Sequence, residues 1–228
     1  MSKNKLAKFA ENLTFKNLFQ SAQYGLPKGE FPLRGKWRSD YFHNDNPIVL
    51  ELGCGKGEYT VALAQRMPDK NYIGIDRKGA RLWRGCKDAQ ELQLSNVAFI
   101  RTQIAQIEHY FAENEVDEIW VTFPDPQPKK DWHRLVSPNY VNSFYKQILK
   151  KEAVIHLKTD SRMLYEYLLE EIQYEQWQLL KDIEDVYKTD EKILTEIQTF
   201  YEKHWLSQGD TISYIAFSPN KMSWKLMS

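Results

Sequence analysis

The chain has 228 residues, enough for one α/β domain with extensions, and its 31 Lys and Arg balance its 31 Asp and Glu. Net charge alone therefore does not indicate a nucleic-acid partner, and no apolar run approaches the roughly 18 residues needed to cross a bilayer. The basic N-terminus lacks the apolar core of a signal peptide, and Cys54 and Cys86 form neither a disulfide framework nor a metal-binding spacing. We expect a cytoplasmic protein with no membrane partner and no metal.

Residues 1–45 are predicted to form a basic extension in front of a domain of residues 46–228. Apolar residues recur at helical spacing over residues 5–20 and predict an amphipathic helix. Further along, basic side chains alternate with Phe31 and Trp37. These aromatic side chains can stack on RNA bases, or they can lie on the core beneath a flexible lead-in, and the pattern leaves both interpretations open.

The most informative segment is residues 48–57, which read I-V-L-E-L-G-C-G-K-G. The apolar run Ile48–Leu50 is typical of a buried parallel strand, and the alternate glycines after Glu51 predict a sharp turn into a helix over residues 59–66. Backbone N–H groups at the beginning of such a helix face a bound ligand. The dinucleotide-binding pattern G-x-G-x-x-G fits poorly, because Glu58 stands where its third glycine would be.

The rest of the chain alternates between strand and helix patterns. Strands are expected at residues 71–76, 97–100, 117–122, 153–157, 177–180 and 211–217, and helices at residues 79–94, 138–150, 163–172 and 190–206. This alternation predicts a parallel sheet with helices on both faces. The last two strands lack the spacing of a helical crossover, so one of them is expected to be antiparallel.

Several side chains follow the predicted strands, at the edge where open α/β sheets bind ligands. Asp76 can accept hydrogen bonds from two ribose hydroxyls or can cap the next helix, and Gln103 lies where an adenine would be bound. Three prolines stiffen the loop of residues 123–134, so that Asp125 and Lys129 are held in place.

One face of the helix at residues 79–94 is strongly basic. Its cationic side chains, together with those just before the helix, are Arg77, Lys78, Arg81, Arg84 and Lys87. A solvated face is the default interpretation of such a pattern.

Several motifs resemble those of known families. Alternate glycines behind an acidic residue resemble motif I of the class I S-adenosylmethionine methyltransferases. The loop F-P-D-P-x-P-K-K at residues 123–130 resembles the tRNA (guanine-N7-)-methyltransferases, as do E-L-G-C-G-K-G, Y-I-G-I-D, H-L-K-T-D and T-F-Y-E in the same order. The resemblance implies a Rossmann-like α/β fold with a seven-stranded, mostly parallel sheet and an antiparallel strand near the C-terminus.

The resemblance also implies an activity, namely methyl transfer from S-adenosylmethionine to N7 of a guanine in the variable loop of tRNA. The residues that it assigns to the cofactor site follow the predicted strands and are Glu51, Gly53, Asp76, Gln103 and Asp125. Asp125 is also the implied catalytic residue. The residues that it assigns to the tRNA substrate are Lys129, Asp160, Thr199, Tyr201 and Glu202.

Guanine N7 carries a lone pair and no proton, so the chemistry asks mainly for alignment. We expect Asp125, with Asp160 or Glu202, to accept hydrogen bonds from the N1–H and N2 amino groups of the guanine. The sequence departs from the family where Gln103 replaces a common Asp, and where the basic cluster after the loop shrinks to His133 and Arg134.

These departures keep alternatives open. The chain could methylate another substrate, or it could be a non-catalytic RNA-binding protein on a methyltransferase fold. A dinucleotide-dependent oxidoreductase is a distant third, because of the poor fit of the glycine pattern. The chain could act as a monomer or as a homodimer.

Overall fold

The structure is a computed structural model that describes residues 3–20 and 31–221. Its centre is an eight-stranded sheet with the order β1-β4-β3-β2-β5-β6-β8-β7. The strands are β1 (Leu18–Gln20), β2 (Ile48–Leu52), β3 (Asn71–Asp76), β4 (Val97–Arg101), β5 (Val116–Thr122), β6 (Leu149–Thr159), β7 (Trp177–Ile183) and β8 (Ser213–Lys221).

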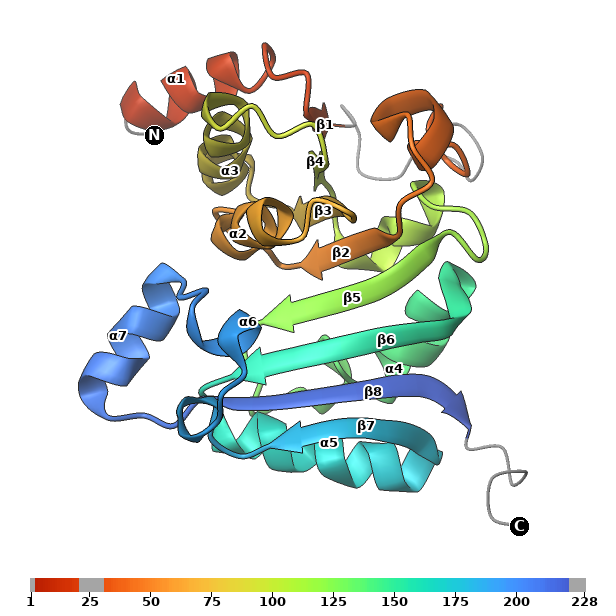
Figure 1. Cartoon of the computed structure of the whole chain (residues 1–228), viewed down its shortest axis with the longest axis vertical. Helices are drawn as coiled ribbons and strands as arrows, with labels where there is room; N and C mark the ends of the chain where they lie inside the picture. Colours follow the sequence, from red (N-terminus) through yellow and green to blue (C-terminus); the bar gives the residue numbers. More distant parts are fainter. Residues whose placement is uncertain (1–2, 21–30, 222–228) are drawn as a thin grey trace.

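Only β8 runs against its neighbours, since it pairs antiparallel with both β6 and β7. In Figure 1 the arrowheads of β2, β5 and β6 point to the edge where α6 and α7 lie, whereas β8 points the other way. The expected class I arrangement, mostly parallel with one antiparallel strand near the C-terminus, is therefore confirmed.

The sheet has eight strands instead of the expected seven because β1 adds an edge strand. β1 pairs parallel with β4, and Leu18 lies opposite Phe99. The helix predicted over residues 5–20 is therefore wrong in its second half, since the first helix ends at Glu11. Leu18 is buried on the sheet, and this tertiary contact overrides the local helical pattern.

Seven α-helices lie in the described part of the chain. They are α1 (Lys3–Glu11), α2 (Glu58–Arg66), α3 (Gly79–Glu91), α4 (Pro138–Ser143), α5 (Arg162–Glu175), α6 (Lys192–Thr195) and α7 (Phe200–Gln208). Short 3₁₀ turns lie at Ile104–His109, Asp131–His133, Tyr145–Gln147 and Val186–Lys188, and a π-helical turn spans Trp37–Phe42. None of the helices described is both long and apolar enough to cross a bilayer.

Two predicted helices are shorter in the structure. The helix expected over residues 138–150 ends at Ser143, because Leu149 already begins β6 and pairs opposite Val116. The helix expected over residues 190–206 is broken into α6 and α7. Between them Ile197 turns into the core, where it is 3% exposed.

Alternate residues of the strands pack on opposite faces of the sheet, as the two-residue repeat of a strand requires. In β2, Leu50 belongs to the apolar cluster that includes residues of α4 and α5, whereas Val49 belongs to the cluster with α2 and α3. Helices thus cover both faces, as the alternating pattern predicted.

Trp37 settles the interpretation of the aromatic residues near the N-terminus. Its side chain is fully buried, its indole Nε1 donates to the Tyr110 carbonyl oxygen at 2.9 Å, and the Phe31 ring lies 5.7 Å away. These two aromatic side chains belong to the core and do not form a base-stacking surface. Described residues of the predicted N-terminal extension therefore share the sheet and the core of the domain.

Candidate active site

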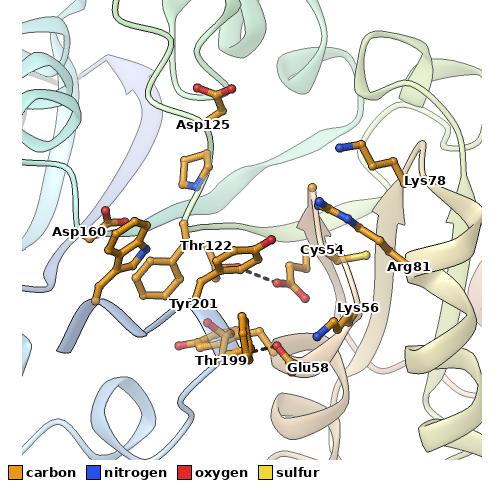
Figure 2. Close-up of a pocket in the computed structure, with 18 of the residues that line it drawn as sticks. Cys54, Lys56, Glu58, Lys78, Arg81, Thr122, Asp125, Asp160, Thr199 and Tyr201 are labelled. Atoms are coloured by element: carbon orange, nitrogen blue, oxygen red, sulfur yellow. Dashed lines mark hydrogen bonds between the residues drawn. The ribbon is translucent and has the colours of Figure 1, made fainter. Parts of the chain in front are cut away.

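Two adjoining cavities lie at the edge of the sheet to which the parallel strands point. The first, of about 400 Å³, is lined by residues at the ends of β2, β5 and β6 and at the beginning of α7 (Figure 2). The second, of about 330 Å³, is lined by residues at the ends of β3 and β4. The residues that line both cavities are Gly53, Lys78, Arg81 and Asp125.

The glycine turn forms the floor between β2 and α2. Gly53 and Gly57 have φ angles of +74° and +72°, a region that other residues rarely adopt. A Cβ atom at Gly57 would lie 2.6 Å from the Phe99 ring, so a side chain there is excluded by packing as well. Asp76 ties the turn to β3, because its Oδ2 accepts a hydrogen bond from the Gly55 N–H at 3.0 Å.

Glu51 lies at the end of β2 and lines the first cavity, although it is only 4% exposed. Its carboxylate accepts hydrogen bonds from the Thr60 N–H at 2.8 Å, from the Thr60 hydroxyl, and from the Thr122 hydroxyl at 2.7 Å. Burial raises the pKa of Glu51 to about 7 despite these donors. A cationic group in the cavity would find here a carboxylate that favours its charge.

Asp76 and Gln103 line the second cavity. Asp76 also accepts the Lys78 N–H at 2.7 Å through Oδ1, so one carboxylate oxygen holds the glycine turn before α2 and the other holds the backbone just before α3. The Gln103 side chain is exposed and follows β4. The second cavity therefore offers an acidic and an amide side chain at neighbouring strand ends.

Asp125 stands in a braced loop between the two cavities. Phe123 adopts a φ angle of +47°, and its N–H donates to the Lys158 carbonyl oxygen at 2.8 Å. Asp125 Oδ1 accepts the Gln127 N–H at 3.1 Å, and the Arg134 Nε donates to the Pro126 carbonyl oxygen at 3.0 Å. These three hydrogen bonds and the prolines thus hold the carboxylate at the cavity mouth.

Arg134 was expected to belong to a basic cluster that binds RNA, but the structure places it elsewhere. It is 7% exposed, and its guanidinium carbon lies 4.1 Å from the centre of the Tyr167 ring. This arginine braces the loop and is too buried to bind an RNA phosphate as part of a surface cluster. His133 remains exposed and lines the second cavity.

Three of the five predicted substrate residues line the first cavity: Asp160, Thr199 and Tyr201. Burial raises the pKa of Asp160 above its ordinary value. Thr199 caps α7, because its hydroxyl oxygen accepts the Glu202 N–H at 3.2 Å. Lys129 is exposed on the loop and is not among the residues that line either cavity.

Glu202 lies behind the wall of the first cavity. Its carboxylate is fully buried, 2.6 Å from the Lys158 Nζ, and it accepts the Tyr187 hydroxyl at 2.8 Å. Lys158 is equally buried and also donates to the carbonyl oxygens of Leu194 and Ile197. The pair therefore fastens the segment between α6 and α7 to the end of β6, and Glu202 does not face the cavity.

Sequence reasoning missed several residues of the first cavity, among them Lys56, Lys78 and Arg81. Lys78 and Arg81 were interpreted as a solvated face, although they follow Asp76 closely in the chain. Lys56 Nζ lies 4.7 Å from the centre of the Phe200 ring. Among the residues described, no group of three or more His, Cys, Asp or Glu side chains could hold a metal ion.

Comparison with known proteins shows what the chain resembles. A family model described as "Putative methyltransferase" matches residues 45–215. A tRNA (guanine-N(7)-)-methyltransferase of Christiangramia forsetii is 53% identical over 220 residues, which cover 95% of this chain and 98% of the relative. One of Porphyromonas gingivalis is 49% identical over 90% of this chain and 85% of the relative.

Solved structures show the same fold at low sequence identity. The 16S rRNA methyltransferase KamB has a TM-score of 0.61 at 14% identity, over 80% of this chain and 90% of that one. A 30S ribosomal A1408 methyltransferase from an uncultured bacterium has a TM-score of 0.61 at 18% identity, over 90% and 98% of the two chains.

Proposed function

The chain belongs to the family of tRNA (guanine-N7-)-methyltransferases, and from this premise we propose that it methylates N7 of a guanine in the variable loop of tRNA. The methyl donor of these enzymes is S-adenosylmethionine. The observation that carries the proposal for the site is the position of Asp125, which lines both cavities. One carboxylate can then act where the donor and the target base meet.

The residues present fit this cofactor. Two adjoining cavities and a glycine turn without side chains leave room for a ligand that has an amino-acid end and a nucleoside end. In the first cavity Glu51 and Gly53 would hold the amino-acid end. In the second, Asp76 would accept the ribose hydroxyls and Gln103 would bind the adenine. When bound, the cofactor supplies an electrophilic methyl group on a sulfonium.

The side chains of the first cavity orient the guanine. Asp125 and Asp160 accept hydrogen bonds from the N1–H and N2 amino groups, which hold the base and favour the positive charge that develops on it. Because N7 carries no proton, no residue has to act as a general base. Entry into the cavity requires the guanine to leave its stack.

Tyr201 and Thr199 line the first cavity at the beginning of α7 and contact the base or its ribose. Tyr201 is 47% exposed there and can stack on a nucleobase. Glu202 does not contact the substrate but supports these two residues, because its buried ion pair with Lys158 holds the N-terminus of α7 in place. Its role is thus one of positioning, and Asp160 is the partner of Asp125.

Lys129 binds a phosphate of the tRNA outside the cavities. Its exposure on the rigid loop favours such a contact. Replacing Lys129 with Ala should weaken tRNA binding most at low salt and should reduce the slope of log K against log salt by about 0.7–0.9. An unchanged slope would leave Lys129 as a surface lysine.

The decisive experiment combines mapping and mutation. Incubation with tRNA and cofactor, followed by borohydride reduction and aniline cleavage, should cut the tRNA at one variable-loop guanine. The Asp125→Ala variant should lose transfer while its cofactor affinity stays within a few-fold. Asp45→Ala is the matched control, because Asp45 is exposed just before β2, at the opposite edge of the sheet. Methylation of another acceptor, or near-normal turnover by Asp125→Ala, would contradict the proposal.

The proposal places the enzyme in the cytoplasm, with tRNA as its macromolecular partner. It acts there as a monomer or a homodimer, two states that sedimentation at assay concentration separates.

A further inference from the structure

Lys78 and Arg81 are the cationic side chains that line both cavities. Lys78 directly precedes α3 and Arg81 lies in its first turn, three residues on, so the two side chains fall on one face of the helix. Figure 2 shows them extending toward the middle of the cavity, from the side opposite Asp160. Both side chains are exposed, so their head groups can reach a ligand.

Two carboxylates near these cations accept hydrogen bonds from backbone groups. Both Asp76 oxygens accept backbone N–H groups, and Glu58 accepts the Phe200 N–H at 3.0 Å. Among the described residues no carboxylate lies within 4.0 Å of the Lys78 ammonium or of the Arg81 guanidinium to form an ion pair. The next basic residue on this face, Arg84, does pair with Asp88. The two cations at the cavities thus differ from the ordinary solvated face expected for this helix.

Two exposed cations without an ion-pair partner at a cavity can bind an anionic group of a ligand through charge-assisted hydrogen bonds. The substrate brings one, because every nucleotide carries a phosphate. We propose that Lys78 and Arg81 form a clamp for the phosphate next to the target guanosine, which fixes the nucleotide while Asp125 and Asp160 hold its base. This inference rests on the proposed function and adds two substrate-positioning residues to it.

The surface beside the clamp has room for the strand that carries the phosphate. A groove of about 590 Å³ runs along α3 and shares Lys56, Glu58 and Arg81 with the first cavity. Lys8 of α1 lies at this groove, with its Nζ 4.4 Å from the centre of the Trp83 ring. A nucleotide chain that leaves the first cavity over Arg81 would therefore meet this groove.

The test measures tRNA binding and cofactor binding separately. Arg81→Gln should weaken tRNA binding on the order of tenfold at low salt, as loss of one charge-assisted contact predicts. The slope of log K against log salt should fall by about 0.7–0.9, and Lys78→Gln should add a similar loss. Calorimetry should find S-adenosylmethionine affinity within about twofold of the wild type.

Two controls guard the interpretation. Arg81→Lys keeps the charge and should restore the salt slope. Lys151→Gln removes an exposed charge near the beginning of β6, at the far edge of the sheet, and should change neither affinity.

Two outcomes would overturn the clamp. A larger loss of cofactor affinity than of tRNA affinity in Arg81→Gln would assign the cations to the carboxylate of the cofactor. An unchanged tRNA affinity and an unchanged salt slope would mean that Lys78 and Arg81 belong to an ordinary solvated helix face. Failure of the proposed function would appear differently, as a wild-type enzyme that forms no 7-methylguanine in tRNA, because the binding assays do not depend on turnover.

Discussion

Replacing Glu51 with Gln should remove a pH dependence from the stability of the protein. The substitution keeps the shape of the side chain and its hydrogen bonds. The amide oxygen can accept from Thr60 in place of Oε2, and the amide N–H can donate to the Thr122 hydroxyl, which rotates to accept. The charge of the buried group is therefore the main property that changes.

The magnitude follows from the pKa of Glu51, which burial raises from its ordinary 4.5 to about 7. Because one pKa unit corresponds to about 1.4 kcal/mol, ionising the group costs about 3 kcal/mol more in the folded than in the unfolded chain. Between these two pKa values the folded state holds a proton that the unfolded state has released. The contribution of Glu51 to stability is thus complete below pH 4.5 and is lost as pH rises through 7.

Urea unfolding at a series of pH values measures the effect. The free energy of unfolding of the wild type minus that of Glu51→Gln should fall by about 3 kcal/mol between about pH 4 and about pH 8. Buried His156 also makes stability depend on pH, because burial lowers its pKa to about 3, and its effect has the opposite sign to that of Glu51. His156 is present in both proteins, so its contribution cancels in the difference between them. Parallel pH profiles of the two proteins would refute the reasoning, since they would mean that Glu51 ionises as readily folded as unfolded.

The other predictions concern stability, and urea unfolding monitored by tryptophan fluorescence or far-UV circular dichroism checks each. Gly57→Ala should cost about 1–3 kcal/mol, because the new Cβ would meet the Phe99 ring at 2.6 Å and the φ angle is +72°; an unchanged midpoint would refute the packing argument. Trp37→Ala should cost about 3–5 kcal/mol, as for a fully buried aromatic side chain, and a loss below about 1 kcal/mol would mean that the N-terminal segment packs loosely. Lys158→Met should cost about 3–5 kcal/mol, because it leaves Glu202 buried without a counter-charge. Adding Glu202→Gln should recover part of that loss, whereas additive losses would show that the two groups do not interact.

The positions of residues near the ends of parallel strands could be predicted from the sequence. β3 has the boundaries that its pattern predicted, and Asp76 stands at its carboxyl end. Once the strands are parallel and adjacent, their carboxyl ends must share one edge, so Glu51 and Asp125 must come close. Spacing along the chain is enough for this part of the site.

Residues whose surroundings come from distant segments could not be assigned. The sequence around Arg134 predicts a cation on the surface, but in the structure its guanidinium packs on Tyr167 and donates to the Pro126 carbonyl oxygen. The motif around Glu202 predicts a contact with the substrate, but in the structure Glu202 is buried in an ion pair with Lys158. Local pattern does not report whether a charged side chain meets a partner that lies many residues away.

The sequence by itself determined the family, the order of the strands β2 to β8, and the strand ends that line the cavities, because these depend on local periodicity and on short motifs. The tertiary structure alone decided which charges are buried, where helices break, and that Lys78 and Arg81 face the cavities. Those outcomes depend on contacts between segments that lie far apart in the chain, such as the counter-charge that a buried charge requires, and these contacts are known only when the chain is folded.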